Sequence, residues 1–370
     1  MAPGVTGKLL AACALWAGVT VLAVREWQAA APKLFGVLLG LALVNAIAAE
    51  PLSVRRIRVF WLGLAIAATG LIALSALFLT EWPQRKLLPL DNLYLALPAG
   101  PRVVDHGGRT GGIGPNQIGG ALALLTPLGL ALTLDRFGSG RRVRALAAVV
   151  LVLALGVLLV TQSRSAYVGA LVGMALVGWW RLRQCTWPLS RRRVAEVALA
   201  VALAGLLAAT VFTWLAPLDS TTDTLTGRIE IWTASVILIG NHLYTGVGPG
   251  QFPLAMDRSF PELGASVAPH IPHAHNFVLQ ALLDLGLPGT VFLSFVIAAA
   301  VRGLIATMRR AADRSLQLLA VGLTGSLLAF FVYGLTDTIA PGARGGLPFW
   351  LVLGLALACG RLPQRGRTAQ

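Results

Sequence analysis

The stretch that decides the fold is ALAAVVLVLALGVLLVTQSRSAYVGALVGMALVGWW, residues 145–180. Two apolar runs, 145–161 and 166–180, are separated by only a few polar residues. Their lengths approach the roughly 17–25 residues that a helix needs to cross a hydrocarbon layer about 30 Å thick. The stretch therefore predicts two transmembrane helices joined by a tight turn.

The same pattern recurs along the whole chain. Of the 370 residues, 56% are hydrophobic and only 12% are charged, which is about half the charged fraction of a soluble domain. We predict an all-α, polytopic membrane protein with about ten spans, in which residues 1–370 form a single integral membrane domain. The remaining spans are expected near 8–24, 34–49, 59–79, 117–134, 194–216, 287–305, 316–336 and 347–360.

The net charge of +15 is explained by the membrane rather than by nucleic acid. Basic clusters such as RRIR, GRRVR and SRRR fall in alternate loops, and these loops with the two termini hold about two-thirds of the Lys and Arg residues. Such an excess marks the cytoplasmic side, where anionic lipid head groups attract it. We therefore expect both termini to be cytoplasmic and no nucleic-acid partner.

This topology places two long loops, about 80–116 and 217–286, on the outer face. Loops of this length in a compact protein are usually functional or disordered. Because both contain apolar and aromatic residues, we expect them to be ordered. All five histidines lie on this face: His106, His242, His270, His273 and His275.

Two arginines on the outer face are candidate ligands for an anion. Arg164, in the turn TQSRSAYVG, either snorkels to lipid phosphates or forms a fixed cation at a site near the hydrocarbon boundary. Arg228 falls in the first turn of an interfacial helix predicted over 227–240, where a cation opposes the helix dipole. A bound phosphate would relieve that conflict. Alternatively, Arg228 pairs with Glu230 or with a neighbouring loop.

The glycines of YTGVGPGQFP, 244–253, predict a tight turn with close backbone approach, because the stretch lacks the rest of any nucleotide-binding fingerprint. The histidines of PHIPHAHN match no common zinc spacing, and no carboxylate or cysteine is close in sequence. The three cysteines also show no metal spacing. We therefore predict neither a metal nor a cofactor.

The stretch HNFVLQALLDLGLPG predicts a short helix that GLPG breaks before the next span. His275 would lie at its start, near both water and membrane, either as a reactive group or as an interfacial residue that holds the loop by hydrogen bonds. The predicted helix has a polar stripe, Asn276, Gln280 and Asp284, and an apolar face, Val278, Leu282 and Leu285.

The chain resembles the O-antigen ligase and polymerase superfamily in four motifs, which occur in this order: SR between two spans, GR..IW, GVG.G.F and HN..LQ....LG..G. The members of this superfamily are bacterial inner-membrane glycosyltransferases that use polyprenyl-diphosphate sugars. GGIGPNQIGGALALLTPL resembles the Gly–Pro–Asn entry to a span in that family. The resemblance covers roughly residues 107–300. The chain departs from the described ligases, which have twelve spans, in having about ten.

The resemblance implies a C-type glycosyltransferase-like helical fold with a long helical periplasmic loop. It implies metal-independent transfer of a glycan from undecaprenyl diphosphate to an acceptor hydroxyl, such as that of a lipid A–core, at the periplasmic face. Arg164 and Arg228 would hold the diphosphate, and His275 would activate the acceptor or stabilise the transition state. Transfer opposite the leaving group would invert the anomeric centre. Candidates for substrate contact are His106, Arg109, His273, Asn276 and Gln280.

Two alternatives stay open. The ligases share their motifs with O-antigen and exopolysaccharide polymerases, so the acceptor is not determined. A membrane transporter would carry polar or charged residues in mid-span and broken helices there. The predicted spans contain almost none, which favours chemistry at one face over passage through the membrane. The sugar, the oligomeric state and the partner proteins are not indicated.

Overall fold

The computed structural model describes residues 3–50, several positions between 53 and 70, and residues 114–184, 225–266 and 271–362. Within these residues every regular element is a helix, and no strand occurs. Seven of the described helices are long and apolar enough to cross a membrane. The expectation of an all-α, polytopic integral membrane protein is therefore confirmed. The expected span 194–216 and most of 59–79 lie outside the described residues.

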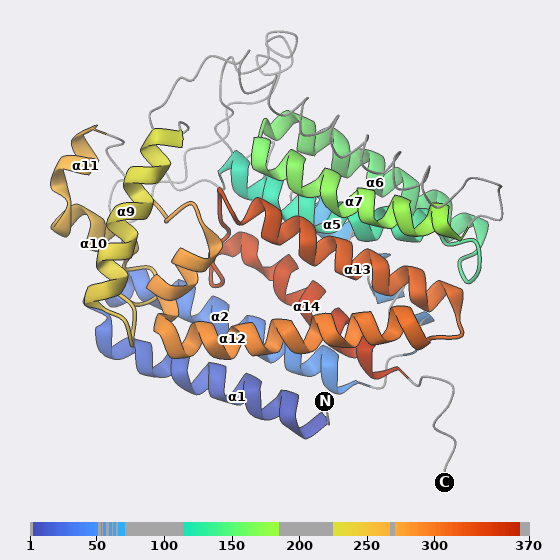
Figure 1. Cartoon of the computed structure of the whole chain (residues 1–370), viewed down its shortest axis with the longest axis horizontal. Coiled ribbons are helices and arrows are strands. Elements are labelled where there is room, and N and C mark those ends of the chain that lie inside the picture. The colour runs from blue at the N-terminus through green and yellow to red at the C-terminus, as the bar shows by residue number, and fades with distance from the viewer. Residues whose placement is uncertain are drawn as a thin grey trace. The chain divides into compact units, whose positions relative to one another are not determined.

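The spanning helices agree with the predicted runs to within a few residues at most ends (Figure 1). A further apolar helix, α14 (Leu347–Arg361), has only 15 residues. The seven longer elements are α1 (Pro3–Val19) with its 3-10 extension η1 (Thr20–Ala23), α2 (Trp27–Ala49), α5 (Pro115–Leu134), α6 (Arg141–Thr161), α7 (Arg164–Arg183), α12 (Phe277–Arg310) and α13 (Arg314–Tyr333).

The chain falls into two compact units, each of which is described by itself. Unit 1 comprises Met1–Glu50, Leu218–Val301 and Gly334–Gly354. Unit 2 comprises Pro51–Pro217, Arg302–Tyr333 and Leu355–Gln370. Most of the candidate residues that the structure describes belong to unit 1, whereas Arg164 belongs to unit 2.

In unit 2 the helices α5, α6, α7 and α13 pack closely, and at some glycines the backbones of two helices come into contact. A Cβ added to Gly173 of α7 would lie 2.5 Å from the carbonyl oxygen of Gly325 in α13. Small residues at such crossings let two helices approach closely, which is how helices associate where lipid tails compete for apolar contact. At one end of this bundle the buried Asp135 accepts a hydrogen bond from the Ser315 hydroxyl at 2.6 Å.

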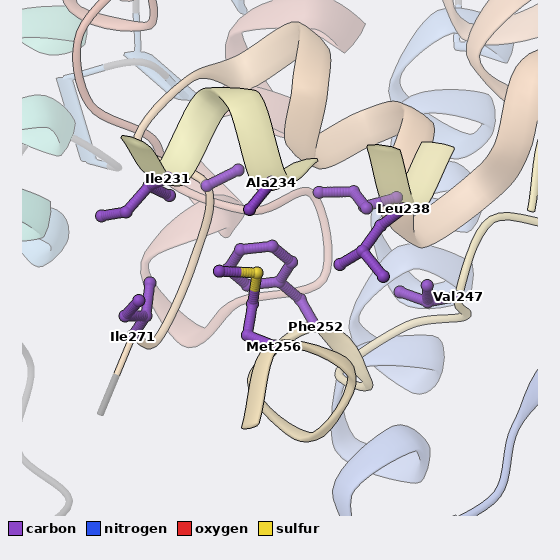
Figure 2. Packing of buried hydrophobic residues seen from close by; sticks show 9 residues of the cluster. Ile231, Ala234, Leu238, Val247, Phe252, Met256 and Ile271 are labelled. Atoms are coloured by element: carbon purple, nitrogen blue, oxygen red, sulfur yellow. The ribbon is translucent and has the colours of Figure 1, made fainter. Parts of the chain in front are cut away.

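The long loop of unit 1 folds into three helices, α9 (Leu225–Asn241), α10 (Phe252–Ser259) and α11 (Pro261–Ser266). The helix predicted at 227–240 is confirmed as α9, and its place at the membrane interface stays a prediction. The apolar face of α9 covers Phe252 and Met256 of α10, with Val247 and Ile271 at the edges of the cluster (Figure 2). The described part of this loop is therefore helical and has its own buried apolar cluster.

The glycine turn between α9 and α10 approaches other backbone closely, as predicted. Val247 N–H donates to the Leu283 carbonyl at 2.8 Å, which ties the turn to α12. An added Cβ on Gly250 would collide with the Ala29 carbonyl of α2. All three glycines have positive φ, which L-residues with a side chain rarely adopt: Gly246, Gly248 and Gly250.

Helix α12 is broken at Gly286, whose backbone (φ 64°, ψ −176°) is not helical. The predicted break at GLPG is therefore confirmed. A Cβ at this position would collide with the Tyr244 carbonyl, so the close approach requires glycine. The break separates the first turns of α12, which carry Gln280 and Asp284, from the long apolar part of the helix.

Several helix ends differ from the prediction, and two of them bear on the site. Helix α2 begins at Trp27 and not near residue 34, so Lys33 lies inside a helix. The predicted span 316–336 is too long, because α13 ends at Tyr333. The next three carbonyl groups, 334–336, accept hydrogen bonds from Phe277 N–H, the Asn276 side chain and the Arg228 guanidinium. These tertiary bonds use acceptors that a continued helix would have occupied.

Candidate active site

One cluster in unit 1 joins residues from three segments that are far apart in sequence. Arg228 comes from the first turn of α9, His273 and His275 from the segment before α12, and Asp337 from the loop after α13. We call these four residues the histidine–aspartate cluster. Three of them were predicted as site residues, and the fourth, Asp337, was not.

Arg228 is turned toward the loop after α13. Its Nη1 donates to the Thr336 carbonyl, and its Nη2 lies 3.9 Å from Asp337 Oδ2. The alternative in which Arg228 pairs with a neighbouring loop is therefore confirmed. The buried Nε atom, however, has no hydrogen-bond partner among the described residues. The guanidinium thus keeps one buried donor without a partner in the described part of the chain.

His275 lies two residues before α12 with φ 48°, in the left-handed region. For a residue other than glycine this conformation costs about 1–3 kcal/mol and tends to occur at functional sites. Its Nδ1 is 3.5 Å from Asp337 Oδ1, and 11% of its side chain is exposed. Because this separation is long for a hydrogen bond, the interaction is mainly electrostatic.

His273 packs against His275 with ring centroids 4.2 Å apart. Burial, and then the charge of His275, lower the pKa of His273 to about 3, although Asp337 acts in the opposite direction. His273 is therefore neutral at any working pH.

Asp337 is fully buried and remains charged. Burial alone would raise its pKa, but the contact with His275 and the electrostatic interactions with His275 and Arg228 lower the pKa to about 2. The Thr338 N–H donates to Oδ1 at 2.8 Å. The only signal in the sequence is a carboxylate directly after a span, in a predicted outer loop. No spacing connects it with the histidines.

Lys33 is a second charged residue that the sequence analysis missed. It is half-buried in the second turn of α2, and its charge helps to lower the pKa of His273. The boundary predicted for this span left it in a short loop, where nothing distinguished it from other surface lysines. With Arg228 it makes the surroundings of the histidines electropositive.

The cluster includes a donor set that a metal ion could use. One ligand atom from each of His273, His275 and Asp337 lies within 4.8 Å of the others. Zinc accepts imidazole and carboxylate ligands. The prediction of no metal was based on the lack of a nearby carboxylate in sequence, and the fold supplies one. Arg228 and Lys33 counteract a cation here, because both add positive charge.

Asn276 and Gln280 have internal partners. Asn276 Oδ1 caps α12 by accepting from Val278 N–H at 2.9 Å. Its Nδ2 donates to the Leu335 carbonyl at 3.0 Å. Gln280 is fully buried and bridges Ala274 and Asp284. Of the predicted polar stripe, Gln280 and Asp284 are buried, whereas Asn276 is only partly buried and Val278 is exposed.

The other predicted site residues are not part of this cluster as described. Arg164 begins α7 after the left-handed Gln162 and the N-cap residue Ser163, so the short turn between two apolar helices is confirmed. Arg164 belongs to unit 2, and its role stays a prediction. His106, Arg109 and His270 lie outside the described residues.

Together these residues form a base paired with a buried carboxylate, beside cationic donors. The arrangement resembles the logic of catalytic triads, in which a carboxylate orients an imidazole and stabilises its protonated form. Such a group can accept a proton from a hydroxyl, and the cations can stabilise negative charge on a leaving group.

One comparison with known proteins finds a match. Residues 148–294 match the sequence model of a family described as O-antigen ligase. The matched region includes Arg164, Arg228 and His275 and ends before Asp337. No curated protein sequence matches the chain. Over this region, which is less than half of the chain, the protein is similar to the O-antigen ligase family.

Proposed function

We propose that the protein transfers a glycan from undecaprenyl diphosphate to an acceptor hydroxyl, as an O-antigen ligase does. The observation that carries this proposal is the contact of His275 with the fully buried carboxylate of Asp337, which Arg228 also approaches. Lipid-linked glycans and membrane lipids are then its partners, with a lipid A–core or another glycan as acceptor.

The reaction needs one proton acceptor. The acceptor hydroxyl attacks the anomeric carbon opposite the leaving group, the bond from that carbon to the diphosphate oxygen breaks, and the configuration inverts. The hydroxyl proton passes to His275 at Nε2, since Nδ1 faces Asp337. Asp337 stabilises the imidazolium that forms. General-base catalysis of this kind contributes about 100- to 10,000-fold.

The leaving lipid diphosphate needs positive charge near its bridging oxygen. Arg228 offers its unpaired Nε and stands in the first turn of α9, where N–H groups also favour an anion. Lys33, which also belongs to unit 1, adds to the positive potential. One well-placed donor of this type is typically worth about 3–4 kcal/mol. None of these steps requires a metal.

The test is the variant His275→Ala in the purified protein, assayed for transfer from a lipid-linked glycan donor. We expect transfer to be abolished while the thermal unfolding midpoint is kept. His242→Ala is the matched control, because His242 is exposed at the end of α9. Wild-type transfer by His275→Ala would rule out the proposed role.

Deleting the protein from its bacterium distinguishes the ligase from the alternatives. Complete polymers stranded on carrier lipid indicate a ligase with a periplasmic active site in the inner membrane. Single repeat units on the normal acceptor indicate a polymerase. Unchanged surface glycans would favour a transporter.

A further inference from the structure

Gln280 and Asp284 form a buried pair one helical turn apart at the start of α12. Gln280 is 0% exposed and Asp284 is 2% exposed. The Ala274 N–H donates to Gln280 Oε1 at 2.9 Å, and Gln280 Nε2 donates to Asp284 Oδ1 at 3.0 Å. Asp284 also accepts a hydrogen bond from the Gly250 backbone. The pair therefore connects the histidine segment with the glycine turn.

The chemistry of the partners fixes the orientation of the Gln280 amide. The Ala274 N–H can only donate, so the amide oxygen must face it, and the amide nitrogen then faces Asp284. Turning the amide over would leave buried polar groups without partners, at a cost of about 1–3 kcal/mol each. The side chain is thus held in one position at both ends.

Ala274 lies between His273 and His275, so this bridge fixes the backbone that carries both imidazoles. On the other side, Phe277 N–H donates to the Gly334 carbonyl at 2.8 Å, which ties the same segment to the loop that leads to Asp337. Without such ties the unfavourable φ of His275 would relax. The contact between His275 and Asp337 depends on both sides being held.

We propose that Gln280 and Asp284 are positioning residues, which hold His275 at Asp337 and do not contact the glycan. This inference rests on the proposed function, because it assigns the role of residues behind the same base. It replaces the expectation that Gln280 contacts substrate, since both ends of its amide are already used inside the protein.

An exchange of the two side-chain types tests the inference. Gln280→Glu puts a second carboxyl group beside Asp284 and removes the donor between them. We expect kcat to fall about 100-fold, the size of effect that a misplacement of about 1 Å can produce, while KM for the donor changes little. In the double variant Gln280→Glu/Asp284→Asn, the amide at position 284 donates to the carboxylate at position 280, so the hydrogen bond between the two helix turns is restored with its direction reversed. The double variant also keeps an acceptor for Ala274 and for Gly250 and leaves the net charge unchanged, so kcat should recover.

Gln317→Glu is the matched control, because Gln317 donates to the Ala311 carbonyl at 2.7 Å in unit 2 and should leave kcat unchanged. Thermal unfolding of each purified variant, with and without undecaprenyl diphosphate, reports folding and donor binding separately from transfer. The folded double variant keeps the test informative even where the single variant does not fold.

Three results would overturn the inference. These are a single variant with wild-type kcat, a raised donor KM at unchanged kcat, and a folded double variant whose kcat does not recover. Each is read against His275→Ala. If one of these results is found while His275→Ala is inactive, only the positioning role is refuted. If His275→Ala is active, the proposed function itself is refuted.

Discussion

Replacing Asp337 by asparagine is the sharpest test of the site, because it changes one buried charge and little volume. The Thr338 N–H can still donate to the amide oxygen of the new side chain. What disappears is the negative charge 3.5 Å from His275 Nδ1 and 3.9 Å from Arg228 Nη2. His275 then loses the group that would stabilise its protonated form during transfer.

The magnitude follows from Coulomb's law. At 3.5 Å and an effective dielectric constant of about 20, a carboxylate and an imidazolium attract each other by about 5 kcal/mol. Arg228 compensates part of the carboxylate charge in the resting protein, so the net loss is smaller. We expect about 3 kcal/mol, which corresponds to a loss of roughly 100-fold in kcat.

The assay measures kcat and donor KM for transfer from a lipid-linked glycan by the purified protein in detergent. Asp135→Asn is the matched control, because Asp135 is also a buried carboxylate with several hydrogen bonds, but it lies in unit 2. That variant should lose stability without a selective loss of kcat. A folded Asp337→Asn variant within a few-fold of wild-type kcat would refute the role assigned to the carboxylate.

Three further predictions concern the cations, the metal and pH. Arg228→Lys should impair transfer severely, because an ammonium group cannot replace the fork that contacts Thr336 and Asp337 while keeping one donor free; full activity would count against diphosphate binding. Transfer should survive strong chelation, and a loss that added zinc reverses would instead assign a metal to His273, His275 and Asp337. The pKa of His273 is lowered to about 3 in the folded protein, so between about pH 6.5 and 3 the unfolded chain binds one more proton than the folded protein. The free energy of unfolding is therefore highest above pH 6.5 and falls as the pH is lowered. Measured by tryptophan fluorescence, the free energy of unfolding should be about 2 kcal/mol lower at pH 5 than at pH 7.5, and this difference should disappear in His273→Gln. Equal acid sensitivity of the wild-type protein and the variant would contradict this.

The sequence predicted the membrane architecture well, because the relevant physics is local. A run of apolar residues long enough to cross the hydrocarbon layer has to form a helix in lipid, whatever surrounds it. The same holds for the break at Gly286 and for the glycine turn, which depend on backbone conformations that few residues adopt. Helix ends were less predictable, as Trp27 and Tyr333 show, since tertiary hydrogen bonds decide where a helix stops.

The sequence also pointed to Arg228 and His275 as candidates, because it shows a cation in a predicted first helical turn and histidines gathered on one predicted face; their roles stay predictions. It could not identify Asp337. That carboxylate reaches His275 only because the carbonyls at 334–336 bond to Asn276, Phe277 and Arg228, which come from other segments. Nor could it tell that Gln280 faces inward. Apolar length and turn chemistry are properties of neighbouring residues, whereas the pairing of a base with its carboxylate is a property of distant segments, which only the folded chain brings together.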